Sequence, residues 1–194
     1  LEFRRVLFRS PISIPDSEVQ VLAGDGAEDD KFGSSVSISG DRMVVGAPYD
    51  NVDGNDNQGS AYVYERNPSG IWVQLPKLTA SDGEENDRFG YSVSISGDRL
   101  VVGVPYGTIH GNGSSGSAYV YERNASGEWV QLPKLTASDG DEGDLFGDIV
   151  SISGDHLVVG AYSDDLFSSA YVYTVAKTDT DGEDRKSTRL NSSH

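Results

Sequence analysis

Residues 89–105 read Phe-Gly-Tyr-Ser-Val-Ser-Ile-Ser-Gly-Asp-Arg-Leu-Val-Val-Gly-Val-Pro, and this stretch decides the fold because the chain repeats it. Its opening Phe-Gly returns 57 residues earlier at Phe32-Gly33 and 57 residues later at Phe146-Gly147. A fixed period of this length is typical of propellers and other arrays, in which each copy buries its apolar face against a neighbour. The sequence therefore predicts a stack of three similar units, at about residues 25–81, 82–138 and 139–183.

Each copy reads as four short strands, most clearly the second copy. Val93 and Ile95 alternate with serines, which is the period-two pattern of a half-buried strand, and residues 100–103 form an apolar strand typical of a sheet centre. Residues 117–123 and 128–132 supply the third and fourth strands, with turn residues between them. Four antiparallel strands in tandem copies are typical of β-propeller blades. We therefore expect an all-β chain, a β-propeller fragment of about three four-stranded antiparallel blades in an incomplete ring.

The repeated motifs resemble a known family. Phe32-Gly33, followed about a dozen residues later by Gly46-Ala47-Pro48, is similar to the FG-GAP repeat of integrin α-subunit propellers. The flanking Lys-Leu-Thr-Ala-Ser-Asp-Gly and Gly-Ser-Ala-Tyr-Val-Tyr-Glu-Arg are closer to a bacterial variant of that repeat. The resemblance covers nearly all of residues 19–183 and implies an extracellular or cell-surface propeller that serves adhesion or ligand binding. The third copy departs from the pattern, since Tyr162 stands where the first two copies have proline.

The two ends of the chain do not belong to the repeat. One codon choice for residues 1–10 has a reverse complement that, read one base in, encodes residues 184–192. Such a relation is typical of a sequencing adapter translated at both ends of an insert. We therefore expect residues 1–10 and 184–194 to be a translated adapter artefact, and we exclude them from the fold.

Residues 11–183 are then expected to be part of a longer parent chain. Val19–Ala23 matches the last strand of a repeat, and Lys177–Glu183 matches the start of another. We therefore expect further propeller blades of the same parent chain as neighbours of the three copies.

Composition narrows the classes of partner. The chain has 15 Lys and Arg against 31 Asp and Glu, for a net charge of −16, so nucleic acid is not an expected partner. No apolar run approaches the roughly 18 residues of a membrane helix, so we expect no membrane insertion. There is no cysteine, which excludes disulfides and Cys-zinc sites. The expected partner is a protein or glycan ligand, with an acidic surface that favours cations and basic groups.

An acidic loop precedes each Phe-Gly and is the strongest candidate for a metal site. Its first and last residues are aspartates in all three copies: Asp25 and Asp30, Asp82 and Asp87, Asp139 and Asp144. Ca²⁺ takes about six to eight oxygen ligands, and carboxylates spaced around a glycine turn supply several, so these aspartates are predicted Ca²⁺ ligands. The alternative is that each aspartate caps a turn with its own side chain. The integrin-type calcium loop would replace the turn at residues 39–41, which is too short here, so the resemblance does not itself imply calcium.

Catalysis is poorly supported by the sequence. Nucleophilic hydrolysis needs a base beside the nucleophile, but the repeat histidines, His110 and His156, lie in a variable loop and in a turn. Glycoside hydrolysis needs one asymmetric pair of carboxylates, whereas these acids recur in every copy. An oxygen-rich loop at residues 50–57 changes to an unrelated sequence at 107–112, which suits either a ligand contact or drift. We expect a non-enzymatic binding or adhesion module, with an accessory domain of a secreted hydrolase and a structural spacer as open alternatives.

Overall fold

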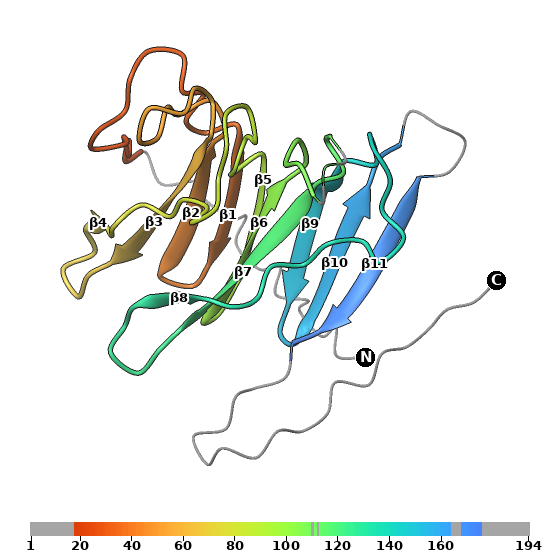
Figure 1. The fold of residues 1–194 in the computed structure, drawn as a ribbon. Coiled ribbons are helices and arrows are strands. Elements are labelled where there is room, and N and C mark those ends of the chain that lie inside the picture. The colour runs from red at the N-terminus through yellow and green to blue at the C-terminus, as the bar shows by residue number, and fades with distance from the viewer. Residues whose placement is uncertain (1–17, 110, 112, 164–167, 176–194) are drawn as a thin grey trace, which may run out of the picture.

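The computed structural model describes residues 18–109, 111, 113–163 and 168–175, which form three antiparallel sheets that follow one another in chain order (Figure 1). Sheet 1 has the order β1-β2-β3-β4, with β1 (Ser35–Ser39), β2 (Arg42–Ala47), β3 (Ser60–Arg66) and β4 (Trp72–Gln74). Sheet 2 has the order β5-β6-β7-β8, with β5 (Ser92–Ser96), β6 (Arg99–Val104), β7 (Ser117–Arg123) and β8 (Trp129–Gln131). Sheet 3 has the order β9-β10-β11, with β9 (Phe146–Ser153), β10 (His156–Ala161) and β11 (Ser169–Thr174).

Each sheet is a meander of consecutive strands. A Gly-Asp turn joins its first two strands, and the glycine has a positive φ in all three sheets, as at Gly97 with φ of 59°. Glycine adopts this backbone conformation without the steric cost that a side chain would add. The second strand lies in the middle of the sheet, and β6 is buried along its whole length between β5 and β7. The predicted strand order and the central position of residues 100–103 are confirmed.

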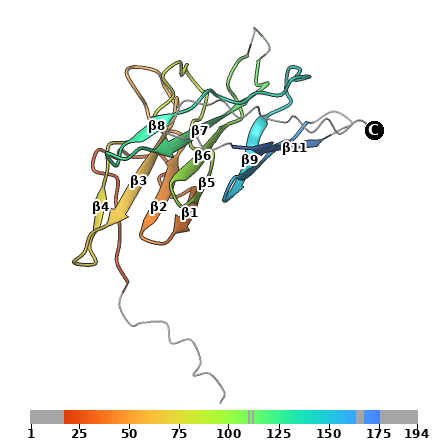
Figure 2. The same ribbon diagram turned by 90° about the horizontal axis from the view of Figure 1, so that it is seen from below.

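The sheets pack face to face. β1 of sheet 1 contacts β5 of sheet 2, and β5 contacts β9 of sheet 3, so the first strands are neighbours from sheet to sheet (Figure 2). Two buried apolar clusters lie between the sheets. The cluster between sheets 1 and 2 contains Val44, Ala61 and Val63 on one side and Phe89, Val93, Ile95, Leu100 and Val102 on the other. The cluster between sheets 2 and 3 contains the equivalent residues Val101, Ala118 and Val120, and Phe146, Val150, Ile152, Leu157 and Val159.

Serine hydroxyls join the first strand of one sheet to the first strand of the next. The Oγ atoms of Ser35, Ser37 and Ser39 accept hydrogen bonds from the backbone amides of Val93, Ile95 and Gly97, at 2.9, 3.1 and 3.0 Å. The Oγ atoms of Ser92, Ser94 and Ser96 do the same for Val150, Ile152 and Gly154, at 3.1, 3.1 and 3.0 Å. These amides belong to the first strand of their sheet and lie on its free edge, which points away from the second strand. The serines therefore satisfy an edge that would otherwise carry unpaired donors.

Two glycines of the repeated motif allow the sheets to approach closely. A Cβ atom added to Gly46 would overlap the carbonyl oxygen of Gly90, and one added to Gly103 would overlap that of Gly147. The glycine of Phe-Gly in one sheet therefore faces the glycine near the end of the second strand in the preceding sheet. This backbone contact explains why both motifs carry glycine at fixed positions.

Arginines link successive sheets at the end where the first strand of each sheet turns into the second. Arg42 Nη1 contacts Asp98 Oδ1 at 2.9 Å, and Arg99 Nη1 contacts Asp155 Oδ1 at 2.6 Å. Arg99 is buried and also donates to Glu122 Oε1 and to the carbonyl oxygen of Val175, at 3.1 and 2.9 Å. Because its charge is matched and its donors are used, this guanidinium can be buried without a large desolvation penalty.

The expected architecture is confirmed as an all-β chain of about three propeller blades. Within the residues that the structure describes, the three sheets do not close into a ring. Among the described residues sheet 3 has three strands and ends with β11, where four strands were expected. The ends at 1–10 and 184–194 and the repeat start at 177–183 lie outside the described residues. No helix in the described part of the chain is long and apolar enough to cross a membrane.

Candidate functional site

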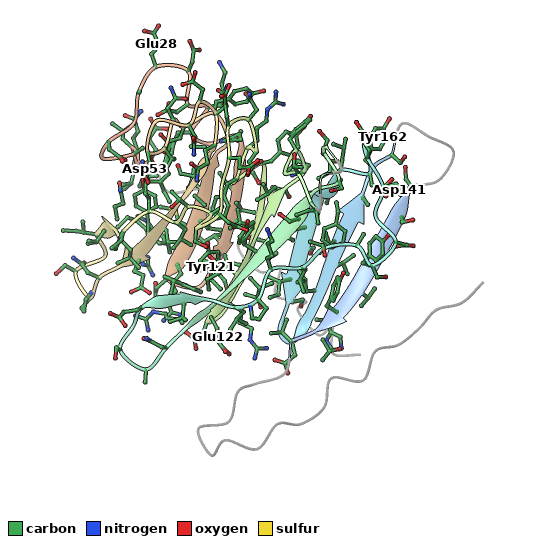
Figure 3. All side chains as sticks on the ribbon, in the orientation of Figure 1. Glu28, Asp53, Tyr121, Glu122, Asp141 and Tyr162 are labelled. Carbon is green, nitrogen blue, oxygen red and sulfur yellow. The ribbon has the colours of Figure 1, made fainter. Side chains whose placement is uncertain are left out.

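The acidic loops and the variable loops gather at one end of the sheets, which we call the loop end. Ser35 pairs with Gly46 and Ala47 with Ser60, so the segment before β1 and the connection between β2 and β3 emerge together. The loop end consists of residues 25–31, 48–59, 82–88, 106–109, 113–116 and 139–145. Figure 3 shows Glu28 and Asp53 there on sheet 1 and Asp141 and Tyr162 on sheet 3, with Glu122 near the other end of sheet 2.

The last aspartate of each acidic loop caps a turn. Its Oδ2 atom accepts a hydrogen bond from the backbone amide three residues earlier, at 2.6 Å for Asp30, 2.8 Å for Asp87 and 2.7 Å for Asp144. The residues on either side of Asp87, Asn86 and Arg88, have positive φ angles of 65° and 60°. The loops of the other two copies repeat this conformation. A short polar side chain that bonds to a nearby amide stabilises such a turn.

The first aspartate of each acidic loop binds a tyrosine of the third strand. Tyr62 Oη donates to Asp25 Oδ1 at 2.9 Å, Tyr119 Oη to Asp82 at 2.6 Å, and Tyr171 Oη to Asp139 at 2.9 Å. In the first two copies a lysine pairs with the same carboxylate: Lys77 with Asp25 at 2.7 Å and Lys134 with Asp82 at 2.5 Å. Each of these aspartates therefore joins its acidic loop to the third strand of the sheet. In the first two copies it also joins the loop to the segment that follows the fourth strand.

These contacts shift the pKa values of the groups involved. The hydrogen bond from Lys77 lowers the pKa of Asp25, and the hydroxyl of Tyr62 lowers it further despite partial burial. Burial raises the pKa of Tyr62 well above its usual value. Burial and the hydrogen bond to Asp139 raise the pKa of Tyr171 to about 12. Asp25 is thus held ionised, and Tyr62 and Tyr171 are held neutral, at pH 7.

Sheet 1 has an additional buried carboxylate, Asp50. Its Oδ2 atom accepts from Ser60 Oγ at 2.6 Å, from Lys77 Nζ at 3.0 Å and from Tyr62 Oη at 3.2 Å. Burial would lower the pKa of Lys77, but the carboxylates of Asp25 and Asp50 raise it, so the ammonium stays charged between them. Gly107 takes the place of Asp50 in the second copy. Of the first two sheets, only sheet 1 therefore has this buried carboxylate beside the lysine.

A cleft of about 570 Å³ opens beside Asp50 at the loop end of sheet 1. It lies between the acidic loop and the connection from β2 to β3, and its acidic and amide side chains come from both. The lining residues are Asp25, Ala27, Glu28, Asp29, Asp30, Lys31, Tyr49, Asp50, Asn51, Asn57 and Lys77. Carboxylates outnumber ammonium groups in this lining, so the cleft favours a cationic group.

The six predicted calcium ligands are not brought together. Within each loop the first aspartate faces tyrosine and the last faces a backbone amide of its own turn. Among the residues that the structure describes, no group of three or more Asp, Glu or His side chains could hold a metal ion. Between Asp25 and Asp50 the position of a bound cation is taken by the ammonium of Lys77. This donor set does not fit Ca²⁺ as it stands, and calcium binding by the acidic loops stays a prediction.

One further contact connects the loop end of sheet 1 with that of sheet 2. The guanidinium carbon of Arg88 lies 4.9 Å from the ring centroid of Tyr49 and 4.2 Å from that of Tyr106. A guanidinium between two aromatic faces is stabilised by the ring quadrupoles. The two tyrosines occupy equivalent positions in successive copies, so this arginine bridges neighbouring blades.

Sequence reasoning identified the recurring aspartates but missed their partners. The signal was present: Tyr62 and Lys77 recur as Tyr119 and Lys134, at the same offsets from the first aspartate. Residues that recur together across copies are candidates for contact. Asp50 gave no such signal, because it occurs in one copy and lay within a loop that we interpreted as variable.

Comparison with known proteins agrees with the repeated geometry. A family model described as FG-GAP repeat matches residues 16–64, 72–121 and 129–173, which together make up more than half of the chain. The second and third matches begin at the first residues of β4 and β8 and end in β7 and β11. The family repeat thus joins the fourth strand of one sheet to three strands of the next. No curated protein matches the chain.

Proposed function

The chain belongs to the FG-GAP repeat family, with three repeats of the bacterial variant, and we propose from this that it is a non-enzymatic binding or adhesion module. We propose further that it acts outside the cell or at the cell surface, as part of an array extended by further blades of the same parent chain. The partner in this proposal is a protein or a glycan that carries positive charge.

The observation that supports this proposal is the uneven distribution of charge between the two ends of the sheets. At the loop end, Glu28, Glu85 and Glu142 are exposed and form no ion pair with any other described residue. At the opposite end, acids and arginines alternate in pairs, as in Arg66 with Asp41 and Arg42 with Glu65. An acidic surface beside a cleft attracts cationic groups and increases their rate of association.

A binding experiment with a defined cationic probe tests this proposal. We expect a lysine- and arginine-rich peptide to bind the immobilised chain with an affinity that falls as salt is raised, because exposed charges are screened. A variant with Glu28→Gln, Asp53→Asn and Asp56→Asn should lose most of this binding, since all three side chains are exposed at the loop end. The control is Glu128→Gln at the opposite end, where the exposed carboxylate accepts from Asn124, and this variant should bind as the parent chain does.

Two outcomes would contradict the proposal. Equal binding by the loop-end variant and the control variant would show that the loop end does not recognise the probe. Turnover of a hydrolase substrate by the purified chain, abolished by the loop-end variant, would contradict a non-enzymatic role. For localisation, protection of the parent protein from added protease on intact cells would contradict an extracellular position.

A further inference from the structure

We propose that two copies of this chain associate head to tail, with sheet 1 of one copy packed on sheet 3 of the other. Each sheet has a front face that contacts the preceding sheet and a back face that contacts the following one. Sheet 2 uses both faces, whereas the front of sheet 1 and the back of sheet 3 contact no other described sheet. Sheet 2 lies between them, so they cannot meet within one molecule (Figure 1). The proposal does not depend on ligand binding at the loop end. In a longer parent chain, further blades would take the place of the second copy on the same two faces.

The front face of sheet 1 matches the faces that are buried in the other sheets. Val93 of sheet 2 is 5% exposed, whereas its equivalent Val36 is 67% exposed. Ile95 is likewise buried, and its equivalent Ile38 is exposed. An apolar groove of about 430 Å³ runs over this face, and its lining includes Val36, Ile38 and Phe32. The front of sheet 1 therefore has the residues of an inter-sheet contact without the sheet that fills it.

The back face of sheet 3 carries the counterpart. Val120 on the back of sheet 2 is 2% exposed, whereas its equivalent Val172 in β11 is 69% exposed. Val158 in β10 is exposed as well, and its equivalents Val44 and Val101 are fully buried. In both internal contacts, the equivalents of these two valines pack against the equivalents of Val36 and Ile38. The front of sheet 1 and the back of sheet 3 are therefore the two halves of one apolar interface. The molecule already contains this interface twice, between sheets 1 and 2 and between sheets 2 and 3.

The hydrogen-bonding groups also correspond. Ser94 and Ser96 of sheet 2 accept from the amides of Ile152 and Gly154. Their equivalents in β9 are Ser151 and Ser153, both exposed on the back of sheet 3. The equivalent donors on the front of sheet 1 are the amides of Ile38 and Gly40. A second copy in the same arrangement would pair these serines with these amides.

A short segment before β1 supplies a backbone contact in the same arrangement. Leu78 forms an isolated bridge with Ala61 of the preceding sheet, and Leu135 does so with Ala118. Val21 is the equivalent of Leu78, and Ala170 is the equivalent of Ala118. Ala170 is exposed, whereas Ala118 is buried. Residues around Val21 of one copy would therefore pair with Ala170 of the other.

The contact between copies is weaker than the internal contacts. Ile149 stands where sheet 2 has Ser92, the first serine that accepts from the following sheet. His156 stands where sheet 2 has Arg99, which pairs with the following sheet. Thr174 replaces the glutamate that pairs with Arg123 in the internal contact. The association should therefore be reversible and should depend on concentration. Because the two faces differ, the contact is heterologous and can continue to further copies.

Complementary variants provide the test. Ile38→Glu places a charge on the front of sheet 1, and Val172→Glu places one on the back of sheet 3. Sedimentation velocity of the unaltered chain should show a mass that rises at least twofold with concentration, while each variant alone should stay monomeric. A 1:1 mixture of the two variants should form dimers and nothing larger, because it restores one intact interface and leaves the remaining faces blocked. Ile71→Glu, at an exposed position of the turn before β4, is the matched control and should associate as the unaltered chain does.

Three results would overturn the proposal. The first is a monomer at every concentration, which would mean that a sheet from the same chain or another molecule covers these faces. The second is association that survives in either single variant, which would indicate a symmetric contact or a different surface. The third is a mixture of variants that stays monomeric although circular dichroism shows that both are folded.

Discussion

At the scale of single residues, the serines of the first strands determine how tightly successive sheets are joined. In each junction two of the three hydroxyls serve an amide whose own residue is buried, as with Ser94 and Ile152, and the third serves an exposed glycine. A hydrogen bond of this kind adds about 1 kcal/mol to stability, but losing the acceptor costs more because the buried donor has no water to replace it. Three such contacts per junction form a polar seam beside the apolar cluster.

Replacing one serine tests this seam. We predict that Ser94→Ala lowers the free energy of unfolding by about 1 to 3 kcal/mol, because the amide of Ile152 is left without an acceptor. The matched control is Ser151→Ala, the equivalent exposed position on sheet 3, which should change stability by less than about 0.5 kcal/mol in dilute samples. Denaturant unfolding of both variants gives the comparison. Equal losses would show that the serines contribute through strand propensity and not through the contact between sheets.

A second residue-scale prediction concerns Asp25 and pH. The pKa of Asp25 is lowered in the folded state by the hydrogen bond from Lys77, so its contribution to stability is present above about pH 4 and is lost as the pH falls towards the lowered value. Asp25→Asn should therefore reduce stability by about 1 kcal/mol at pH 7 and by less at pH 2.5. Thermal unfolding at both pH values measures the difference, with exposed Asp56→Asn as control. A gap that stays constant with pH would contradict the charged contact.

The strand residues of β1 and β5 show what could be predicted from the sequence and what could not. The alternation at Val93 and Ile95 predicted a half-buried strand, and the structure confirms it for β5. In β1 the same alternation is reversed, with Val36 and Ile38 exposed. Strand periodicity reports which residues share a face, but burial of that face depends on what packs against it. From the sequence, the serines were interpreted only as the polar residues of the alternating strand pattern. Their hydrogen bonds join residues 58 positions apart, and no local pattern in the sequence relates such residues.

At the scale of elements, the contact between sheets depends on glycine pairs. Gly103 in β6 and Gly147 in β9 approach so closely that neither tolerates a side chain. The sequence alone placed these glycines at recurring positions within strand-rich segments. It could not show that the two motifs face each other across a junction, because they belong to different copies of the repeat.

A single methyl group tests this contact. We predict that Gly103→Ala costs at least about 2 kcal/mol, because the methyl group would meet the backbone of Gly147, which cannot move aside as a flexible side chain could. Gly160→Ala is the matched control at the equivalent position of sheet 3, where the nearest atom is Ile149 Cβ at 3.6 Å. That variant should be neutral or slightly more stable. Similar thermal unfolding of the two variants would argue against close packing of the sheets.

At the scale of the whole molecule, the period of the sequence determines the architecture and the family, while the site follows from it only in part. The repeat predicted about three blades, and the three sheets and the family match confirm this. The recurring aspartates were found because they share the period. Their pairing with Tyr62 and Tyr119 was not, and buried Asp50 was interpreted as part of a variable loop.

The calcium prediction belongs to this scale, since it concerns all three loops together. If the acidic loops bind Ca²⁺, calcium at ten times its dissociation constant should stabilise the fold by about 1.4 kcal/mol and raise the melting temperature. Asp87→Ala with Asp144→Ala should reduce this gain. Magnesium at the same ionic strength is the control for screening. Calorimetry without saturable uptake at millimolar calcium would support turn capping as the whole role of these aspartates.

The serine seam gives the array a direction, and this has a consequence for how such chains change length. Sheet 1 gives hydroxyl acceptors to sheet 2, and sheet 2 gives them to sheet 3, so both junctions are built from the same atoms. Recombination that inserts or removes one 57-residue unit in register would therefore leave each remaining junction chemically intact. Copy number can then drift without a new interface having to arise, and only the two outermost sheets need sequences of their own. The substitutions in sheet 3, Ile149, His156 and Thr174, lie on its back face, which forms no such junction among the described residues.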